Sequence, residues 1–270
     1  MAASQPLFAI LSALVESRAG LHYGPAEKEL FLERVGSRAQ EAGFESLLDY
    51  YYFLRYDPAS AAELEKLVDV LVVNETFFFR ELHPLRVMVD RFVVPLVQQG
   101  KRPRIWSAAC STGEEPLTLA MLLAEKNLLG RVGLIASDIS TKVLGRARAG
   151  RFGRRALREV PDQGLVDRWL RADGGTLEVA SSLREAIDWS QVNLCEPEQL
   201  LPAGSCDVIL CRNVLIYFSD QTAASVIAGL TRSLRPDGAL FVGVSESLLR
   251  FGSTLACEEL DQAFLYRKAR

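Results

Sequence analysis

Residues 104–116, R-I-W-S-A-A-C-S-T-G-E-E-P, have the pattern of a ligand-binding turn between a β-strand and a helix. In a doubly wound sheet, such a turn lies at the carboxyl ends of the strands, where nucleotides bind. Gly113 is its single glycine, so the three-glycine dinucleotide fingerprint is absent. Glu114 and Glu115 stand where a pyrophosphate would bind. They would repel a phosphate and attract an ammonium or sulfonium group, as in S-adenosylmethionine; alternatively, they only stabilise the first helical turn.

A carboxylate at the end of the next predicted strand agrees with this turn. Asp138, in L-I-A-S-D-I-S, lies 25 residues after Gly113. An acid about 20 residues beyond such a turn commonly binds ribose hydroxyls. Alternatively, Asp138 caps the helix that begins near Ser140, although capping would not explain its spacing from the turn.

A third group of polar side chains follows the apolar run at 207–211. Arg212 and Asn213 end this predicted strand, and Tyr217 comes four residues later in C-R-N-V-L-I-Y-F. A strand, a polar pair and an aromatic residue are typical of a pocket rim. Tyr217 alone could equally be a core aromatic residue with a hydrogen-bonded hydroxyl.

The scarcity of certain side chains excludes several mechanisms. The chain has two histidines, His22 and His83, and five scattered cysteines without a C-x-x-C pair. A histidine-rich metal site, a zinc site, a histidine triad and a disulfide framework are therefore not expected. We predict a site without metal.

The elements that must position these residues fall into two regions. From residue 6 to about 79, apolar residues recur at helical spacing, and turn signals predict about four helices. After Lys101, short β-rich runs alternate with helical stretches, which predicts an α/β domain with a mainly parallel sheet. The predicted strands are 104–109, 132–137, 207–211, 239–244 and an edge strand at 263–268, and the predicted helices are 116–126, 141–149 and 221–234.

The stretch 150–193 interrupts this alternation. It is longer than a normal connection and contains β-like pieces at 176–180 and 186–189, so we predict an inserted subdomain. The overlapping stretch 142–171 holds nine basic and three acidic residues, a net charge of plus six. This basic stretch is either a solvated face or a docking surface for an acidic partner. Its basic residues are Lys142, Arg146, Arg148, Arg151, Arg154, Arg155, Arg158, Arg168 and Arg171.

Composition places the chain among ordinary globular proteins. Hydrophobic residues make up 49% and charged residues 24%. The apolar run 6–15 lacks a preceding positive charge, and 67–79 is interrupted by Asp69, Asn74 and Glu75. We therefore expect no signal peptide and no membrane insertion, and predict a cytoplasmic protein. The sequence pI of 5.6 disfavours a nucleic-acid partner.

Five motifs, in order along nearly the whole chain, resemble those of CheR-type chemotaxis-receptor methyltransferases, which modify protein glutamates. They are N-E-T-F-F-F-R at 74–80, W-S-A-A-C-S-T-G-E-E-P at 106–116, A-S-D-I at 136–139, V-N-L at 192–194 and C-R-N-V-L-I-Y-F at 211–218. The resemblance implies a Rossmann-like, adenosylmethionine-dependent methyltransferase domain at 81–270 with a small inserted β-subdomain at about 150–192. A small all-helical N-terminal domain, 1–80, would precede it and end in a linker.

The resemblance also implies roles for the matching residues. Asn74, Thr76 and Arg80 would close over the cofactor and the methyl-transfer site. Glu114 would face the methionine portion, Asp138 the ribose, and Asn193 with Leu194 the adenine. Arg212 and Asn213 would complete the pocket, and Tyr217 would stand at the reacting centre. Arg80 and Tyr217 are the candidate catalytic residues that orient the acceptor.

The implied reaction transfers a methyl group from S-adenosylmethionine to glutamates in the cytoplasmic domain of methyl-accepting chemoreceptors. Glutamate, with a reference pKa of about 4.3, is ionised at neutral pH and needs no general base. The alternatives are a non-catalytic module that senses adenosylmethionine, and a methyltransferase with another acceptor. One departure is that residues 1–83 carry seven basic and thirteen acidic side chains, whereas the family is expected to have a basic N-terminal face. The basic stretch 142–171 is therefore the predicted receptor-docking surface.

Overall fold

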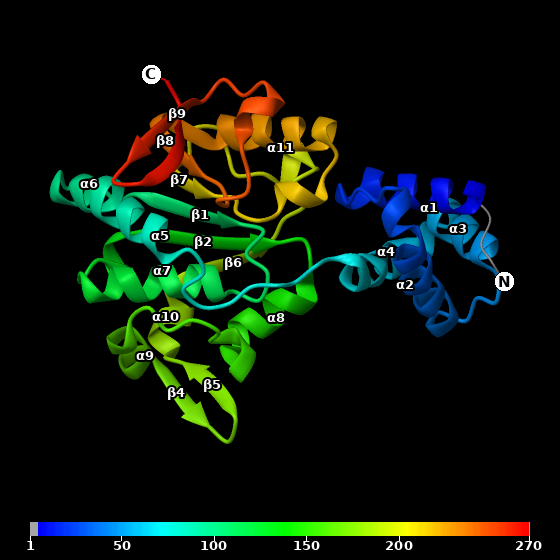
Figure 1. Cartoon of the computed structure of the whole chain (residues 1–270), viewed down its shortest axis with the longest axis horizontal. Helices are drawn as coiled ribbons and strands as arrows, with labels where there is room; N and C mark the ends of the chain where they lie inside the picture. The colour runs from blue at the N-terminus through cyan, green and yellow to red at the C-terminus, as the bar shows by residue number, and fades with distance from the viewer. Residues whose placement is uncertain (1–4, 270) are drawn as a thin grey trace. The chain divides into compact units, whose positions relative to one another are not determined.

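The computed structural model describes residues 5–269, which form two compact units (Figure 1). The first unit comprises residues up to 73 together with 216–223, and the second comprises 74–215 together with the chain from 224 onward. The segment 74–80, predicted as a linker ending the first domain, thus belongs to the second unit. Among the described residues, no helix is long and apolar enough to cross a membrane.

The first unit is helical, as its apolar spacing predicts. Its α-helices are α1 (Gln5–Ala19), α2 (Lys28–Glu41), α3 (Leu47–Tyr56) and α4 (Ala61–Leu71). Short 3-10 turns, η1 (Pro25–Glu27) and η2 (Pro58–Ser60), precede α2 and α4. Ser46 caps α3 by accepting a hydrogen bond from the backbone N–H of Asp49 at 3.3 Å. The buried faces of these helices meet through Leu11, Phe31, Val35, Leu54 and Leu67.

The returning segment 216–223 is attached to this unit by backbone contacts. Leu21 and Phe218 form an isolated antiparallel bridge, and the N–H of His22 donates to the carbonyl of Tyr217 at 2.9 Å. Because these bonds join residues almost two hundred positions apart, local sequence patterns gave no sign of them.

The second unit is built on a seven-stranded sheet. The spatial order is β6 (Ile187–Gln191), β2 (Gly133–Asp138), β1 (Arg104–Ala108), β7 (Cys206–Leu210), β8 (Leu234–Phe241), β10 (Ala263–Arg267) and β9 (Ala256–Leu260). The first five strands in this order are parallel, and β10 and β9 are antiparallel to their neighbours. The order reverses beside β1, which is the point where open α/β sheets bind ligands. The predicted fold class is confirmed.

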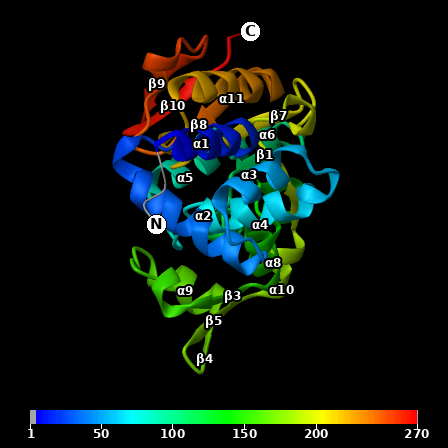
Figure 2. The same cartoon turned by 90° about the vertical axis from the view of Figure 1, so that its right-hand side faces the viewer.

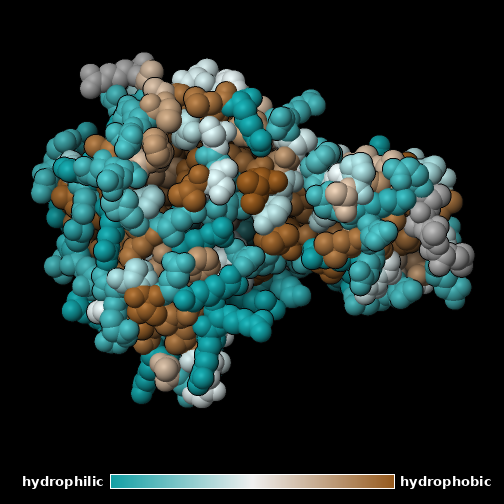
Figure 3. Space-filling model, in the orientation of Figure 1, coloured by the Kyte–Doolittle hydropathy of each residue, from teal (hydrophilic) through white to brown (hydrophobic). Residues whose placement is uncertain are grey.

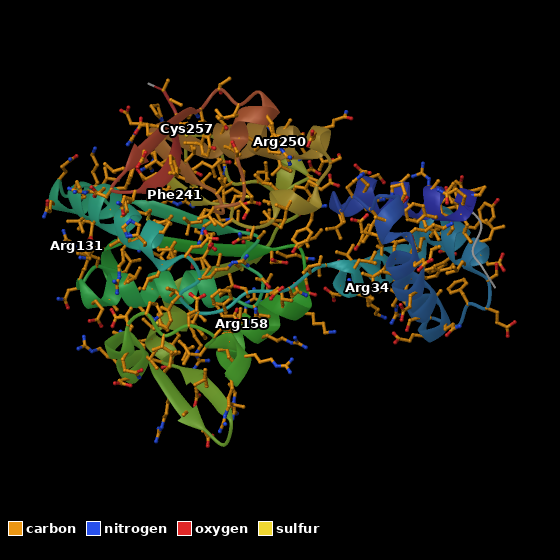
Figure 4. The ribbon with its side chains drawn as sticks, viewed as in Figure 1. Arg34, Arg131, Arg158, Phe241, Arg250 and Cys257 are labelled. Carbon is orange, nitrogen blue, oxygen red and sulfur yellow. The ribbon has the colours of Figure 1, made fainter. Side chains whose placement is uncertain are left out.

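Helices cover both faces of this sheet. Figure 1 shows α7 (Glu114–Glu125) and α8 (Thr141–Ala149) on one side and α11 (Asp220–Ser233) on the other. Before β1, the chain forms α5 (Leu82–Met88), the π-helical turn η3 (Val89–Val93) and α6 (Val94–Gln98). Phe92 of this turn packs edge-on against Phe241 of β8, which is labelled in Figure 4, with ring centroids 5.8 Å apart. Shorter 3-10 turns are η4 (Leu129–Arg131), η6 (Pro197–Gln199), η7 (Leu215–Tyr217) and η8 (Leu248–Phe251).

An inserted three-stranded sheet follows α8. Its antiparallel order is β3 (Arg151–Gly153), β5 (Thr176–Val179) and β4 (Leu170–Asp173). Figure 2 shows these strands with α9 (Gln163–Trp169) beside them; η5 (Arg154–Ala156) and α10 (Ser181–Glu185) complete the connection. The predicted β-like piece at 186–189 is not part of this sheet. It forms β6, which pairs in parallel with β2 at one edge of the main sheet.

The C-terminal strands differ from the prediction as well. The run 263–268 was expected at the edge, but β10 lies between β8 and β9. The edge strand is β9, whose sequence A-C-E-E-L is mostly exposed and lacks the alternation that identifies a half-buried strand. Its charged residues suit an edge, where they discourage pairing with another chain.

Candidate active site

The turn between β1 and α7 has an unusual backbone. Ala109, Ser111 and Gly113 all have positive φ, at 58°, 51° and 94°. A Cβ on Gly113 would lie 2.7 Å from Cβ of Ala147 and 3.0 Å from the Trp189 ring. Gly113 is therefore required both by its left-handed conformation and by the close approach of α8 and β6. The prediction of a strand, a tight turn and a helix holds here in detail.

Asp138 ties this turn to the end of β2. Its carboxylate accepts hydrogen bonds from the backbone N–H of Ser111 at 2.8 Å and of Ser140 at 3.0 Å. Ser140, rather than Asp138, caps α8, because its hydroxyl accepts from the N–H of Val143 at 3.2 Å. Helix capping thus does not account for the bond from Asp138 to Ser111. The role of Asp138 at the ribose stays a prediction.

The two acids of the first α7 turn have different environments. Glu114 is 3% exposed and accepts a hydrogen bond from the Thr112 hydroxyl at 2.6 Å. Burial raises the pKa of Glu114. Glu115 instead accepts from the Ser107 hydroxyl and from Nη1 of Arg212, both at 2.7 Å. Of the pair, Glu114 alone lacks a cationic partner within the described structure, which makes it the better candidate to face a positively charged ligand.

The side-chain oxygen of Ser111, in the turn, is available to a ligand. Within residues 5–269, the buried hydroxyl of Ser111 has no hydrogen-bond partner. Buried hydroxyls are usually paired, so an unpaired one at the carboxyl edge of the sheet suits a polar ligand group. Buried Glu114 and Asp138 lie in the same turn and at the adjoining strand end, and the three groups together would suit a cationic nucleoside.

The segment 74–81 runs from exposed to buried positions. Asn74 is exposed and Thr76 partly exposed, whereas Phe78 and Phe79 are fully packed. The N–H of Phe78 donates to the Ala156 carbonyl at 2.7 Å, and that of Phe79 to the Thr118 hydroxyl at 3.2 Å. These bonds explain why the segment belongs to the second unit.

Arg80 is partly exposed, in contrast to the buried Phe78 and Phe79 before it. Its Nη1 donates to the Glu75 carbonyl at 3.1 Å, and its guanidinium carbon lies 5.7 Å from the Phe77 ring centroid. Arg158, labelled in Figure 4, lies 5.5 Å from the same centroid and pairs with the Glu75 carboxylate at 2.6 Å. Arg80 is thus oriented by contacts within its own segment.

Arg212 is buried and hydrogen-bonds three other residues. Its side chain is 2% exposed, and its guanidinium bonds Glu115 at 2.7 Å, Glu81 at 2.8 Å and the Arg80 carbonyl at 3.1 Å. Burial would lower its pKa, but Glu115 and Glu81 outweigh that effect and raise it. Most of its donors are therefore engaged by protein. Its buried Nε has no hydrogen-bond partner within residues 5–269. Arg212 supports the site through its Nη1 and Nη2 bonds, and its part in completing the pocket stays a prediction.

Asn213 is held by a carboxylate that the sequence interpretation missed. Its backbone is left-handed, with φ at 59°. Glu246 accepts from the N–H of Asn213 at 2.6 Å, of Gly243 at 2.7 Å and of Leu215 at 2.8 Å. Glu115 lies within a quoted motif and Glu81 directly follows another, whereas Glu246 lies outside all five. Nothing in local spacing shows which partner each carboxylate binds.

Asn193 and Leu194 follow β6, next to the Asp138 strand end. The N–H of Val192 donates to the Asp138 carbonyl at 3.0 Å, and Asn193 accepts from the N–H of Cys195 through its side chain at 3.0 Å. Leu194 is 8% exposed. The structure thus brings 193–194 beside Asp138, in agreement with a shared adenosine site, although neither assignment is tested by it. Tyr217 belongs to the helical unit, and its role at the reacting centre stays a prediction.

The parallel sheet with its reversal of strand order, the single-glycine turn, the acids in the first turn of α7 and the acid that ends β2 fit an S-adenosylmethionine-dependent methyltransferase with a preceding helical domain. Residues 74–264 match the family model described as the CheR methyltransferase SAM-binding domain, and residues 6–72 match the CheR all-alpha domain. The chain belongs to the CheR methyltransferase family, and S-adenosylmethionine is its cofactor.

Named relatives agree with this assignment. Chemotaxis protein methyltransferase 2 of Vibrio cholerae is 33% identical, with 93% of this chain and 88% of that protein covered. Chemotaxis protein methyltransferase 1 of Pseudomonas aeruginosa is 30% identical over 99% of both chains. The Escherichia coli chemotaxis protein methyltransferase is 33% identical, with coverage of 92% and 86%.

Proposed function

We propose that this methyltransferase modifies glutamate side chains in the cytoplasmic domains of chemotaxis receptors, forming methyl esters. The family membership and the relatives' names support a chemotaxis acceptor. A cytoplasmic location follows from the location of that acceptor. The structural observation that best supports this reaction is the set of hydrogen bonds made by Arg212, which joins the Arg80 segment to the first turn of α7.

The proposed site holds the cofactor with the edge of the sheet. Asp138 would bind the ribose, Asn193 and Leu194 the adenine, and Glu114 the positively charged methionine portion. Asn74, Thr76 and Asn213 would close the pocket. When bound, S-adenosylmethionine supplies a methyl group that is activated by its sulfonium. Glu114 is the residue best suited to favour that positive charge.

The protein's task at the acceptor is mainly positional. A glutamate carboxylate is already ionised, so no residue needs to remove a proton. Arg80 would orient the acceptor carboxylate through its guanidinium, and Tyr217 would assist through its hydroxyl. Holding the reacting groups in line and excluding water can supply several kcal/mol of the catalytic effect.

Mass spectrometry of a purified receptor cytoplasmic domain tests this proposal. After incubation with the enzyme and S-adenosylmethionine, peptide mapping should find added methyl groups on glutamates. A receptor domain with those glutamates replaced by alanine should gain none. Methyl groups on lysine or arginine would show another acceptor. Tight cofactor binding without any transfer would instead favour the sensing module.

The basic stretch 142–171 is the proposed receptor-docking surface. Arg151, Arg158 and Arg168 pair with acids that lie outside the stretch, at Asp173, Glu75 and Glu125. Arg154 and Arg155 are exposed, and so are Lys142 and Arg146 of α8. The surface over α8 is hydrophilic (Figure 3). An acidic receptor face would complement this charge.

Charge reversal tests the docking surface separately from the chemistry. The Arg154→Glu/Arg155→Glu variant should methylate the receptor more slowly while binding adenosylhomocysteine with unchanged affinity. The matched control is Lys101→Glu/Arg102→Glu, an equal charge change on exposed residues that precede β1. Equal methylation rates for the two variants would show that 142–171 is only a solvated face.

A further inference from the structure

We propose that Glu81 is a positioning residue for methyl transfer, acting through Arg212 to fix the backbone that carries Arg80. This inference rests on the proposed role of Arg80 at the acceptor. Glu81 itself needs no contact with cofactor or acceptor. Its carboxylate instead determines where the preceding residue stands.

The backbone around Arg80 is held in an unfavourable shape. Phe79 and Glu81, the residues on either side of Arg80, have positive φ of 67° and 50°. Side chains other than glycine rarely adopt this left-handed conformation. Such strain persists only where surrounding contacts impose it, and it concentrates at functional sites. The side-chain contacts of Glu81 are candidates for the restraint that holds this backbone.

The Glu81 carboxylate joins two loops at the carboxyl edge of the sheet. One oxygen accepts from Nη2 of Arg212 at 2.8 Å and from the N–H of Val244 at 3.3 Å. The other lies 3.5 Å from the side-chain amide of Asn213. Arg212 and Asn213 follow β7, and Val244 follows β8. Glu81 thus fastens its own segment to both strand ends.

The link to Arg80 is direct. The same Nη2 of Arg212 that bonds Glu81 also donates to the Arg80 carbonyl at 3.1 Å. The Glu81 side chain is 16% exposed and that of Arg212 is 2% exposed, so water competes little for these bonds. One guanidinium nitrogen therefore restrains the carbonyl of one residue and the side chain of the next.

The second arm of Arg212 extends the restraint to the cofactor turn. Nη1 bonds Glu115 at 2.7 Å, and Glu115 also accepts from the Ser107 hydroxyl of β1 at 2.7 Å. Glu81 and Glu115 are two negative charges against one positive charge on Arg212. Removing the Glu81 charge therefore leaves the buried guanidinium paired with Glu115, and a neutral variant should fold.

The test compares Glu81→Gln and Glu81→Ala with wild type. We expect kcat for receptor methylation to fall about tenfold for glutamine, which keeps one acceptor oxygen, and about a hundredfold for alanine. The Kd of adenosylhomocysteine, measured by titration calorimetry, should change less than about threefold, because no ligand contact is removed. Glu258→Gln is the matched control, since it neutralises a carboxylate of the edge strand β9 that pairs with Arg267 of β10.

A double mutant separates positioning from a purely structural role. If Glu81 acts through Arg80, adding Glu81→Gln to Arg80→Ala should lower kcat less than about twofold further. Independent losses that multiply would overturn the inference while leaving the role of Arg80 intact. Normal turnover of Arg80→Ala alone would instead overturn that role. A kcat for Glu81→Ala within about twofold of wild type, or a Kd that rises as much as kcat falls, would also contradict the positioning role.

Discussion

The carboxylate of Asp138, at the end of β2, accepts a hydrogen bond from the backbone N–H of Ser111 at 2.8 Å. This bond joins the proposed ribose-binding acid to the turn that carries the unpaired Ser111 hydroxyl. The two strand ends therefore act as one unit, and a change in Asp138 should alter both cofactor binding and the turn.

The Asp138→Asn variant should bind adenosylhomocysteine at least about tenfold more weakly, since a charged hydrogen bond contributes about 1.5–3 kcal/mol. Asparagine keeps one acceptor oxygen but replaces the other with an amide donor that would face the N–H of Ser111 or Ser140. Titration calorimetry measures the affinity. Asp188→Asn, a carboxylate change at an exposed position of β6, is the control. Equal affinities for wild type and Asp138→Asn would remove Asp138 from the site.

Gly113→Ala should destabilise the second unit by about 1–3 kcal/mol, because it strains a left-handed residue and places a methyl group against Ala147 and Trp189. Urea denaturation measures the free energy of unfolding. Gly145→Ala is the matched control, since Gly145 lies within α8 and has open space around its Cβ position. That control should be stabilised by about 0.5–1 kcal/mol. A Gly113→Ala protein as stable as wild type would show that the turn relaxes easily.

Glu114 gives a pH prediction whose sign is fixed by burial. Its pKa is raised in the folded state above the ordinary value of 4.5, so the folded protein binds a proton more tightly there than the unfolded chain. This contribution to stability is present below pH 4.5 and is lost as pH rises through the folded pKa. Ionised Glu114 is therefore a stability cost at neutral pH.

Glu114→Gln should remove that cost. The variant should be more stable than wild type at pH 8, by a margin that shrinks as the pH falls toward 5, yet bind S-adenosylmethionine more weakly. Thermal unfolding and calorimetry across this pH range check both effects. Greater stability together with undiminished binding would contradict the assignment of Glu114 to the cofactor's positive charge.

Tyr217→Phe should lower the methyl-transfer rate more than it lowers cofactor affinity. The change removes only the hydroxyl. Loss of one group that orients a reacting partner lowers the rate by about ten- to a hundredfold. Steady-state kinetics with the receptor domain, together with calorimetry, separates the two effects. A variant with wild-type kcat would exclude Tyr217 from the reacting centre.

The sequence was most informative where a local pattern reflects a local structure. The spacing between Gly113 and Asp138 predicted that the turn and this acid serve one ligand, and in the structure Ser111 of the turn donates a hydrogen bond to Asp138. Helical periodicity likewise predicted the first unit. These features depend on short stretches of chain whose side-chain order sets the element and its ends.

The remaining features depend on contacts between distant residues. The charge of Arg212 is shared by Glu81 and Glu115, which lie 131 and 97 positions away, so its sequence surroundings did not reveal these partners. The piece at 186–189 was assigned to the insertion because a strand's partner is not encoded in its own alternation. Strand β9 was missed because an exposed edge strand carries little apolar signal.

We propose that the enzyme forms glutamate methyl esters on chemoreceptors. The most direct measurement is transfer of labelled methyl from S-adenosylmethionine to receptor-containing membranes of the source organism, followed by brief alkaline treatment of the labelled proteins. Esters hydrolyse under these conditions, whereas methylated nitrogen does not. We predict that a receptor-sized band is labelled and releases volatile methanol. A base-stable label, or no label despite tight cofactor binding, would contradict the account.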